Sequence, residues 1–192
     1  MTPPLIMLID LQSCSGCHAC AVACKAEHRP QGGTQRLGVQ YVDFGVFPQA
    51  GRAFIPSLCQ HCTDAPCIEA CPVTAIGHAP DGSVQIDAAT CICSGPCVSA
   101  CPYGAIALDG IAAAAQKCDW CAERRGRDEP TACQATCPTH AIHIGALDDP
   151  AIEAELLRGT YTTWEPQPTS PRVRYGGLTP EIAASLRRID EI

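Results

Sequence analysis

Sixteen cysteines dominate the chemistry that this sequence can carry, and they fall into four runs of four. The runs read C-x2-C-x2-C-x3-C, C-x2-C-x4-C-x3-C, C-x-C-x3-C-x3-C and C-x2-C-x11-C-x3-C, and the last three are each followed by proline. In chain order they are Cys14, Cys17, Cys20 and Cys24; Cys59, Cys62, Cys67 and Cys71; Cys91, Cys93, Cys97 and Cys101; and Cys118, Cys121, Cys133 and Cys137.

Such thiols could form disulfides, hold zinc or ligate iron–sulfur clusters. The C-x2-C-x2-C run packs three thiols too closely for three separate disulfide partners. Structural zinc sites use two short Cys or His pairs separated by a loop. A tight run of three thiolates with a more distant Cys-Pro is typical of iron–sulfur clusters, and in two-cluster ferredoxins the fourth Cys ligates the other cluster. The spacing therefore favours four clusters in two interlocked units over zinc or disulfides.

The composition limits the other functions open to the chain. Aromatic residues make up only 5% of the 192 residues, so metal binding must help to stabilise the fold. The net charge of −7, with Lys25 and Lys117 as the only lysines, argues against nucleic-acid binding. The longest apolar run, residues 5–9, is too short to span a bilayer, so we expect no direct membrane insertion.

The location follows from the region before that apolar run. It contains no basic residues, so we expect neither a Sec nor a twin-arginine signal on this chain. This favours a cytoplasmic location. The alternative is a periplasmic location, reached as folded cargo of a partner that carries a twin-arginine signal.

Internal repeats indicate how the cysteines are positioned. Ile9-Asp10 and Ile86-Asp87 stand at the same distance before runs one and three, and Cys-Pro-x-x-Ala-Ile occurs three times. Each Cys-x3-Cys-Pro ending predicts a single helical turn. Short strands are predicted at residues 5–10, 52–57, 83–87, 105–109 and 141–145. The expected fold class is α+β, with duplicated bacterial-ferredoxin-like units.

The region after residue 147 has a different composition. We expect a helix from Asp149-Pro150 to Gly159, an extended arm over residues 161–177, and a terminal helix after Thr179-Pro180. The predicted apolar faces are Ile152, Leu156 and Leu157 in the first helix and Ile182, Leu186 and Ile189 in the second. The second face either folds back on the chain's own body or docks a partner, including a second copy.

The order of the four runs, with the long C-x11-C in the last, resembles the four-cluster ferredoxin-like subunits of molybdenum and tungsten pterin oxidoreductases. These include dimethyl sulfoxide, polysulfide and thiosulfate reductases and some formate dehydrogenases; the polyferredoxin subunit of tungsten aldehyde oxidoreductases is a more distant likeness. The resemblance covers residues 5–150. It rests on the cysteine runs and on the segments Cys14-Ser-Gly-Cys17-His-Ala-Cys20, Cys101-Pro102-Tyr103-Gly104-Ala105 and Lys117-Cys118-Asp119-Trp120-Cys121.

The resemblance implies four [4Fe–4S] clusters at sites that we name A to D. Site A comprises Cys14, Cys17, Cys20 and Cys137, and site B comprises Cys118, Cys121, Cys133 and Cys24. Site C comprises Cys59, Cys62, Cys67 and Cys101, and site D comprises Cys91, Cys93, Cys97 and Cys71. With full thiolate sets, His18 and His61 are not needed as ligands, and we expect Trp120 and Tyr103 to shield clusters from water.

Site D departs from the family pattern, which places its second ligand at position 94. Ser94 stands there, and Cys93 comes one residue early. Either the loop reshapes so that Cys93 still binds, or the site holds a [3Fe–4S] cluster and Cys93 is free. The retention of sixteen cysteines favours ligation by Cys93.

The resemblance also implies domains and a function. The first ferredoxin-like unit spans residues 1–50 and 110–147, the second spans 51–109, and residues 148–192 contact a partner. The expected function is a non-catalytic relay between a molybdenum- or tungsten-pterin catalytic subunit and a second redox partner, either a quinone-reactive membrane subunit or a soluble flavoprotein. The sequence contains no phosphate-binding turn and no nucleophile elbow. The alternative is a free polyferredoxin that serves several oxidoreductases.

Overall fold

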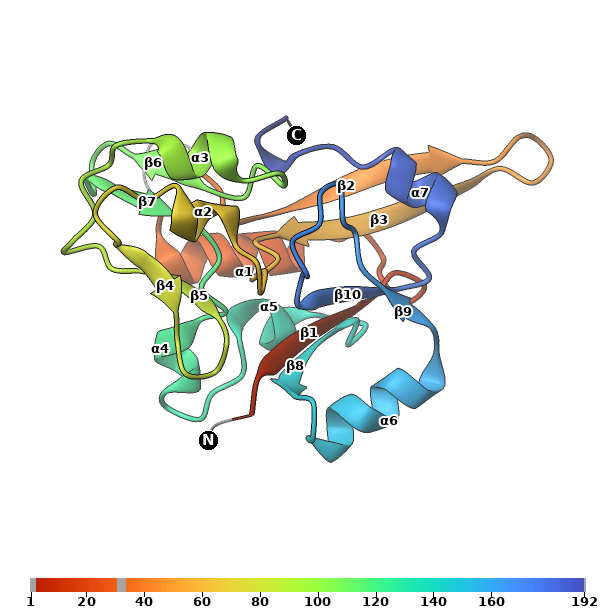
Figure 1. The fold of residues 1–192 in the computed structure, drawn as a ribbon. Coiled ribbons are helices and arrows are strands. Elements are labelled where there is room, and N and C mark those ends of the chain that lie inside the picture. Colours follow the sequence, from red (N-terminus) through yellow and green to blue (C-terminus); the bar gives the residue numbers. More distant parts are fainter. Residues whose placement is uncertain (1–2, 31–33, 192) are drawn as a thin grey trace.

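The computed structural model describes residues 3–30 and 34–191, which form short helices and four small sheets (Figure 1). The strands are β1 (Leu5–Asp10), β2 (Leu37–Phe44), β3 (Gly51–Leu58), β4 (Ile76–His78), β5 (Val84–Ile86), β6 (Ala107–Asp109), β7 (Ala114–Gln116), β8 (Ile142–Ala146), β9 (Tyr161–Thr162) and β10 (Val173–Gly176). The helices are α1 (Ala19–His28), α2 (Pro66–Glu69), α3 (Pro96–Ala100), α4 (Ala122–Arg125), α5 (Ala132–Thr136), α6 (Pro150–Arg158), α7 (Pro180–Ala184) and a final 3-10 turn, Ile189–Glu191. This mixture agrees with the predicted α+β class.

The apolar run near the N-terminus forms β1, which lies inside a four-stranded sheet with the order β8-β1-β10-β9. Both faces of β1 are covered, as a continuous apolar run predicts. Met7 and Ile9 belong to the main core, whereas Ile6 and Leu8 pack with Ile152 of α6 on the other face. Strand β1 is antiparallel to β8 and parallel to β10, so this N-terminal strand pairs on both sides with strands from the C-terminal part of the chain.

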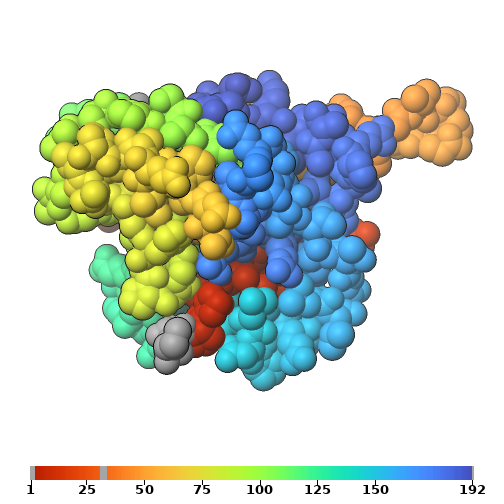
Figure 2. All heavy atoms as spheres, viewed as in Figure 1, coloured from red at the N-terminus to blue at the C-terminus, as the bar shows by residue number. Residues whose placement is uncertain are grey.

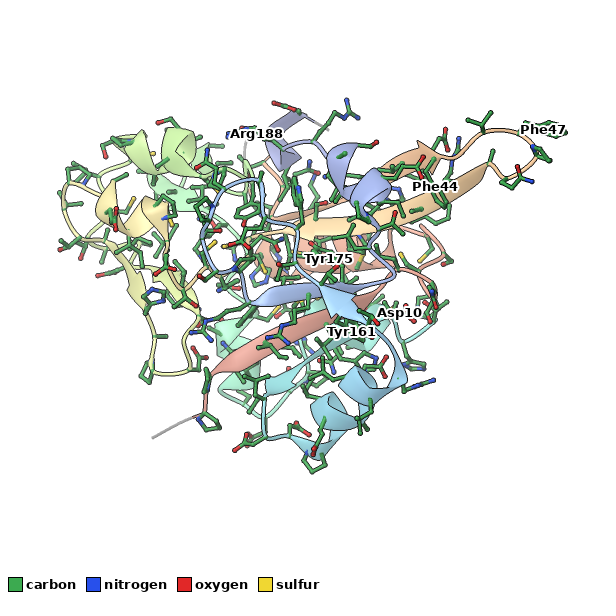
Figure 3. All side chains as sticks on the ribbon, turned by 45° about the vertical axis from the view of Figure 1, so that its right-hand side comes forward. Asp10, Phe44, Phe47, Tyr161, Tyr175 and Arg188 are labelled. Atoms are coloured by element: carbon green, nitrogen blue, oxygen red, sulfur yellow. The ribbon has the colours of Figure 1, made fainter. Side chains whose placement is uncertain are left out.

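Strands β2 and β3 form a long antiparallel hairpin. At its base, Val39 and Ile55 are buried in the main core. Its tip stands clear of the rest of the molecule (Figures 1 and 2), and Phe47 lies at the far end (Figure 3). Val46 and Phe47 are 80% and 89% exposed. The hairpin therefore combines a structural base with an exposed apolar tip.

The short helices pack in two pairs, α1 with α5 and α2 with α3. The second pair lies close to two small antiparallel hairpins, β4–β5 and β6–β7 (Figure 1). The five predicted strands are found as β1, β3, β5, β6 and β8, with small shifts at their ends. The predicted helical turns are found as α2, α3 and α5. The longest helix, α1, and strand β2 were not predicted.

The predicted arm over residues 161–177 is partly wrong, because it contains β9 and β10. Strand β10 pairs along β1, and Val173 and Tyr175 are fully buried. Figure 3 shows Tyr175 in the interior of the molecule. This strand is difficult to predict from the sequence. Three prolines precede it, and the segment shows no alternation of apolar and polar residues that would indicate a strand.

The two C-terminal helices begin as predicted. The Asp149 carboxylate accepts a hydrogen bond from the Ala151 amide, and the Thr179 hydroxyl accepts one from Ile182. The prediction that Leu157 belongs to the apolar face of the first helix is wrong, because its side chain is 83% exposed. The apolar face of the second helix packs against the main core through Ile182 and its neighbours. Of the two alternatives for this face, the structure shows the one in which it folds back on the chain's own body.

Helices long and apolar enough to cross a membrane do not occur in residues 3–30 and 34–191.

Candidate metal centres

The third cysteine of every run occupies the same place in a helix. Cys20, Cys67, Cys97 and Cys133 are each the second residue of their helix, in α1, α2, α3 and α5 respectively. The fourth cysteine follows one turn later, at or just beyond the end of the three short helices and inside α1. Two residues that are four positions apart lie on the same side of a helix and are separated by about one turn. Each helix can therefore present one thiol to each of two adjacent sites.

The thiols expected at site A line one cavity. Its walls include Cys14, Cys17, Cys20 and Cys137, together with Val39 and Pro56 from the hairpin and Ile142 from β8. Cys17 is exposed and Cys14 and Cys137 are partly exposed. Site A therefore lies near the surface, and the base of the hairpin forms one wall of its cavity. Nearby, the His18 ring stacks on Tyr41, whose ring meets Phe54 edge-on.

The thiols expected at site D line a second cavity. Cys71, Cys91, Cys93 and Cys97 border it with Ser94, Ile76, Leu108 and Ala115. Cys71, Cys91 and Cys93 are partly exposed, so this site also lies near the surface. The backbone of Cys93 adopts a left-handed φ of 55°.

The thiols expected at site B are buried and close enough to perturb one another. Burial, together with the nearby Cys133 and Cys121 thiols, raises the pKa of Cys24 to about 12. Burial likewise raises the pKa of Cys118 well above its usual value, with Cys24 and Cys133 adding to the effect.

Site C has the same character. Burial raises the pKa of Cys62 and Cys67 to about 12, and Cys59 and Cys101 contribute in both cases. A buried thiol keeps its proton unless a positive centre binds it, which a metal would do. The structure thus brings together all four expected sets.

Backbone amides point at the sulfur atoms in the three Cys-Pro-x-x-Ala motifs. The amides of Ala75, Ala105 and Ala141 lie 3.2, 3.4 and 3.3 Å from the sulfur of the cysteine four residues earlier. In each motif the residue before the alanine is left-handed: Thr74, Gly104 and His140. This turn aims the amide back at the sulfur. Amide donors to sulfur favour the thiolate and tune an iron–sulfur site.

Polar side chains that do not belong to the cysteine set also contact site B. The Nε2 atom of His28, in α1, lies 3.3 Å from the Cys121 sulfur. It also lies 3.7 Å from the Asp119 carboxylate, which in turn pairs with Arg36. The His28, Asp119 and Cys121 ligand atoms lie within 4.8 Å of one another. Because Cys121 already belongs to site B, we interpret the group as support for that site.

Sites B and C meet at a buried junction of three side chains. The His61 and Trp120 rings stack with centroids 3.9 Å apart, and both rings are fully buried. Lys117 is only 3% exposed, and its ammonium donates to the carbonyls of Val84 and Cys118. His61 is neutral, because burial lowers its pKa far below the usual value and Lys117 lowers it further.

This junction tests whether clusters fit the cysteine sets. The His61 Nδ1 atom accepts a hydrogen bond from the Val84 amide, so the ring proton resides on Nε2. The Trp120 Nε1 atom is buried without a hydrogen-bond partner in the described residues. Buried donors are normally satisfied. Trp120 directly precedes Cys121 of site B, and the sulfide of a cluster bound there would supply the missing acceptor. The cysteine sets fit iron–sulfur clusters.

The C-terminal segment closes site C. Its Thr169 hydroxyl lies 2.7 Å from the hydroxyl of Tyr103, whose side chain is buried. Farther along, Arg188 donates to the Cys101 carbonyl at 2.7 Å. Gly104 has a φ of 60°, and a Cβ there would come within 2.1 Å of the Asp190 carboxylate. The tail therefore fits tightly over the loop that carries Cys101.

Sequence reasoning missed Lys117, His28 and the closing role of the tail. A lysine directly before a ligand cysteine is a weak signal by itself. His28 lies far from run four in sequence and meets it only because α1 packs on α5.

Comparisons with known proteins agree with this chemistry. The model of the 4Fe-4S dicluster domain family matches residues 51–147. The chain is 36% identical over 162 residues to an uncharacterised ferredoxin-like protein, YdhX, of Escherichia coli K12, covering 83% of this chain and 72% of that one. It is 37% identical over 159 residues to the thiosulfate reductase electron transfer subunit PhsB of Salmonella typhi, covering 80% and 81%.

A third relative is a subunit of the tetrathionate reductase of Salmonella typhimurium. It is 35% identical over 187 residues, covering 94% of this chain and 75% of that one. The chain belongs to the 4Fe-4S dicluster domain family. The predicted resemblance to ferredoxin-like iron–sulfur subunits of oxidoreductases is confirmed.

Proposed function

We propose that this chain is the non-catalytic electron-transfer subunit of an oxidoreductase complex and that it carries four clusters in series. When bound, the clusters would accept and pass on single electrons. The single observation that carries the proposal is the arrangement of four thiol sets, two buried in the interior and two open to the surface. The relatives named for thiosulfate and tetrathionate reductases support the assignment to a complex.

Shared helices support the order A-B-C-D. Helix α1 carries Cys20 of site A and Cys24 of site B, and α5 with the residue after it carries Cys133 and Cys137 of the same two sites. Helices α2 and α3 serve sites C and D in the same way. The two helix pairs support the proposal of two interlocked units, to which we assign residues 1–50 and 110–147 and residues 51–109 respectively. The stack of His61 on Trp120 joins them.

The difference in burial supports sites A and D as the places where electrons enter and leave the chain. The partly exposed thiols at sites A and D suit electron exchange with another protein. The buried thiols of B and C suit transfer within the chain, since low dielectric surroundings and fixed donors set the reduction potential.

The partners we propose are a molybdenum- or tungsten-pterin catalytic subunit and a second redox subunit, either quinone-reactive or flavin-containing. The test is purification of the natively expressed protein under anaerobic conditions. We expect copurification at a fixed stoichiometry with a pterin-containing subunit, and about sixteen iron and sixteen sulfide atoms per chain. A monodisperse monomer without a partner, still loaded with iron, would favour the free polyferredoxin instead.

A further inference from the structure

The four cysteine loops share one backbone turn. In every run, the residue two places after the first cysteine is left-handed. These residues are Gly16, His61, Cys93 and Trp120, with φ values of 68°, 46°, 55° and 54°. Side chains other than glycine adopt this conformation at some cost, so its recurrence marks a required geometry.

The residue directly after this turn is not the same in all four runs. In three runs the next residue is the second cysteine, namely Cys17, Cys62 or Cys121. In the third run the next residue is Ser94. Cys93 therefore occupies the place of Gly16 in the turn, and Ser94 occupies the place of Cys17.

The segment before the turn has the same register in runs one and three. The Cys14 amide donates to the Asp10 carbonyl at 3.1 Å, and the Cys91 amide donates to the Asp87 carbonyl at 3.0 Å. In both cases the aspartate also bonds the hydroxyl three residues on, from Ser13 or Thr90. The first cysteines are therefore equivalent.

The segment after the turn also has the same register in runs one and three. His18 precedes α1 with a φ of 61°, and Gly95 precedes α3 with a φ of 97°. The third cysteines, Cys20 and Cys97, are then the second residues of their helices. Both flanks of the third loop are therefore in register with those of the first loop, which favours position 94 over position 93 as the ligand position.

We propose that the Ser94 hydroxyl oxygen, and not the Cys93 sulfur, is the fourth protein ligand at site D. This rests on the proposed presence of a cluster there. Ser94 lines the same cavity as Cys71, Cys91 and Cys97, and Cys93 borders it as well. Binding forms one iron–oxygen bond and releases the hydroxyl proton to water. An alkoxide is a harder ligand than a thiolate, so site D differs chemically from the other three sites.

The test compares Ser94→Ala with Cys93→Ala in the full chain, with clusters assembled anaerobically. We expect Ser94→Ala to lose about one iron per chain and to give the paramagnetic signal of an oxidised [3Fe–4S] cluster. Cys93→Ala should keep the wild-type iron content and spectrum. Ser94→Cys should also keep all its iron, with an altered signal from the reduced cluster.

The reverse pattern, with the three-iron signal in Cys93→Ala and not in Ser94→Ala, would overturn the proposal. A wild-type chain that already shows this signal, unchanged in Ser94→Ala, would overturn it as well. Circular dichroism and the signals of sites A to C verify that each variant folds. Wild-type protein without any iron at site D would instead contradict the four-cluster function itself.

Discussion

The inner sites B and C and the outer sites A and D use the same pieces, a tight cysteine loop followed by a short helix, yet they differ in surroundings. The inner thiols are enclosed by aromatic rings, a buried lysine and the C-terminal tail. The outer thiols line cavities that open to the surface. Identical local motifs thus acquire different properties through long-range packing, and that difference separates internal transfer from exchange with partners.

The largest expected effect is the response to removal of iron. Structural metal binding contributes on the order of 10 kcal/mol to the folding of small sites, and this chain has few aromatic residues to replace it. A chelator under reducing conditions should therefore unfold most of the chain. Circular dichroism and hydrogen exchange would measure this loss. An iron-free form that stays ordered and melts cooperatively would contradict it.

A milder treatment, limited oxidation, can separate the inner sites from the outer sites. With limiting oxidant, sites A and D should lose iron before B and C, because their thiols are reachable from solvent. Paramagnetic resonance at successive times would follow the order. Simultaneous loss from all sites would remove the distinction between inner and outer sites.

Single ligand variants give the next largest effect. Cys118→Ala removes a buried inner ligand and should cause loss of more than one cluster and a much lower melting temperature. Cys17→Ala removes an exposed outer ligand, and we expect loss of about one iron or one cluster with the fold retained. Iron analysis and thermal unfolding of the two variants, prepared in parallel, measure the contrast. Equal damage from both would contradict it.

Much of this comparison could be predicted from the sequence. The spacing of the cysteines and the three Cys-Pro-x-x-Ala copies predicted four clusters and the helical turns, because both depend on local geometry. The sets of sites A to D, which combine different runs, followed only from the family resemblance. The pairing of β10 with β1 could not be predicted, since Val173 and Tyr175 follow a proline-rich segment without alternation. Nor could the junction: His61 and Trp120 belong to different runs, and only the packed units bring their rings together.

Lys117 provides a smaller but more specific test of the inner environment. Its buried positive charge lies close enough to lower the pKa of Cys67, so it should stabilise the reduced, more negative state of a cluster at site C. We expect Lys117→Met to lower that reduction potential by on the order of 60 mV, a tenfold change in a one-electron equilibrium. Two buried carbonyls lose their donor, which should also cost about 1–3 kcal/mol of stability.

Lys25→Met is the matched control for this charge, because Lys25 is exposed on α1 and the chemical change is the same. Its potential should stay close to that of the wild type, since water screens exposed charges. Potentiometric titration followed by paramagnetic resonance compares the three proteins. An equal shift in both variants would show that net charge, and not the buried junction, sets the potential.

The smallest expected effect concerns the hydrogen bond between His28 and the Cys121 sulfur at site B. A donor to a ligand sulfur withdraws charge and favours the reduced cluster. His28→Leu should therefore lower the potential of site B by less than Lys117→Met lowers that of site C. The reason is that the His28 ring acts through a dipole, whereas Lys117 acts through a full charge. His78→Leu is the control: the His78 side chain is exposed and bonds only the Thr63 carbonyl among the contacts described, so the potential of site B should stay at its wild-type value in this variant. If His28→Leu leaves every potential unaltered while Lys117→Met shifts one, burial and fixed charge alone distinguish the inner sites, and donors to sulfur do not.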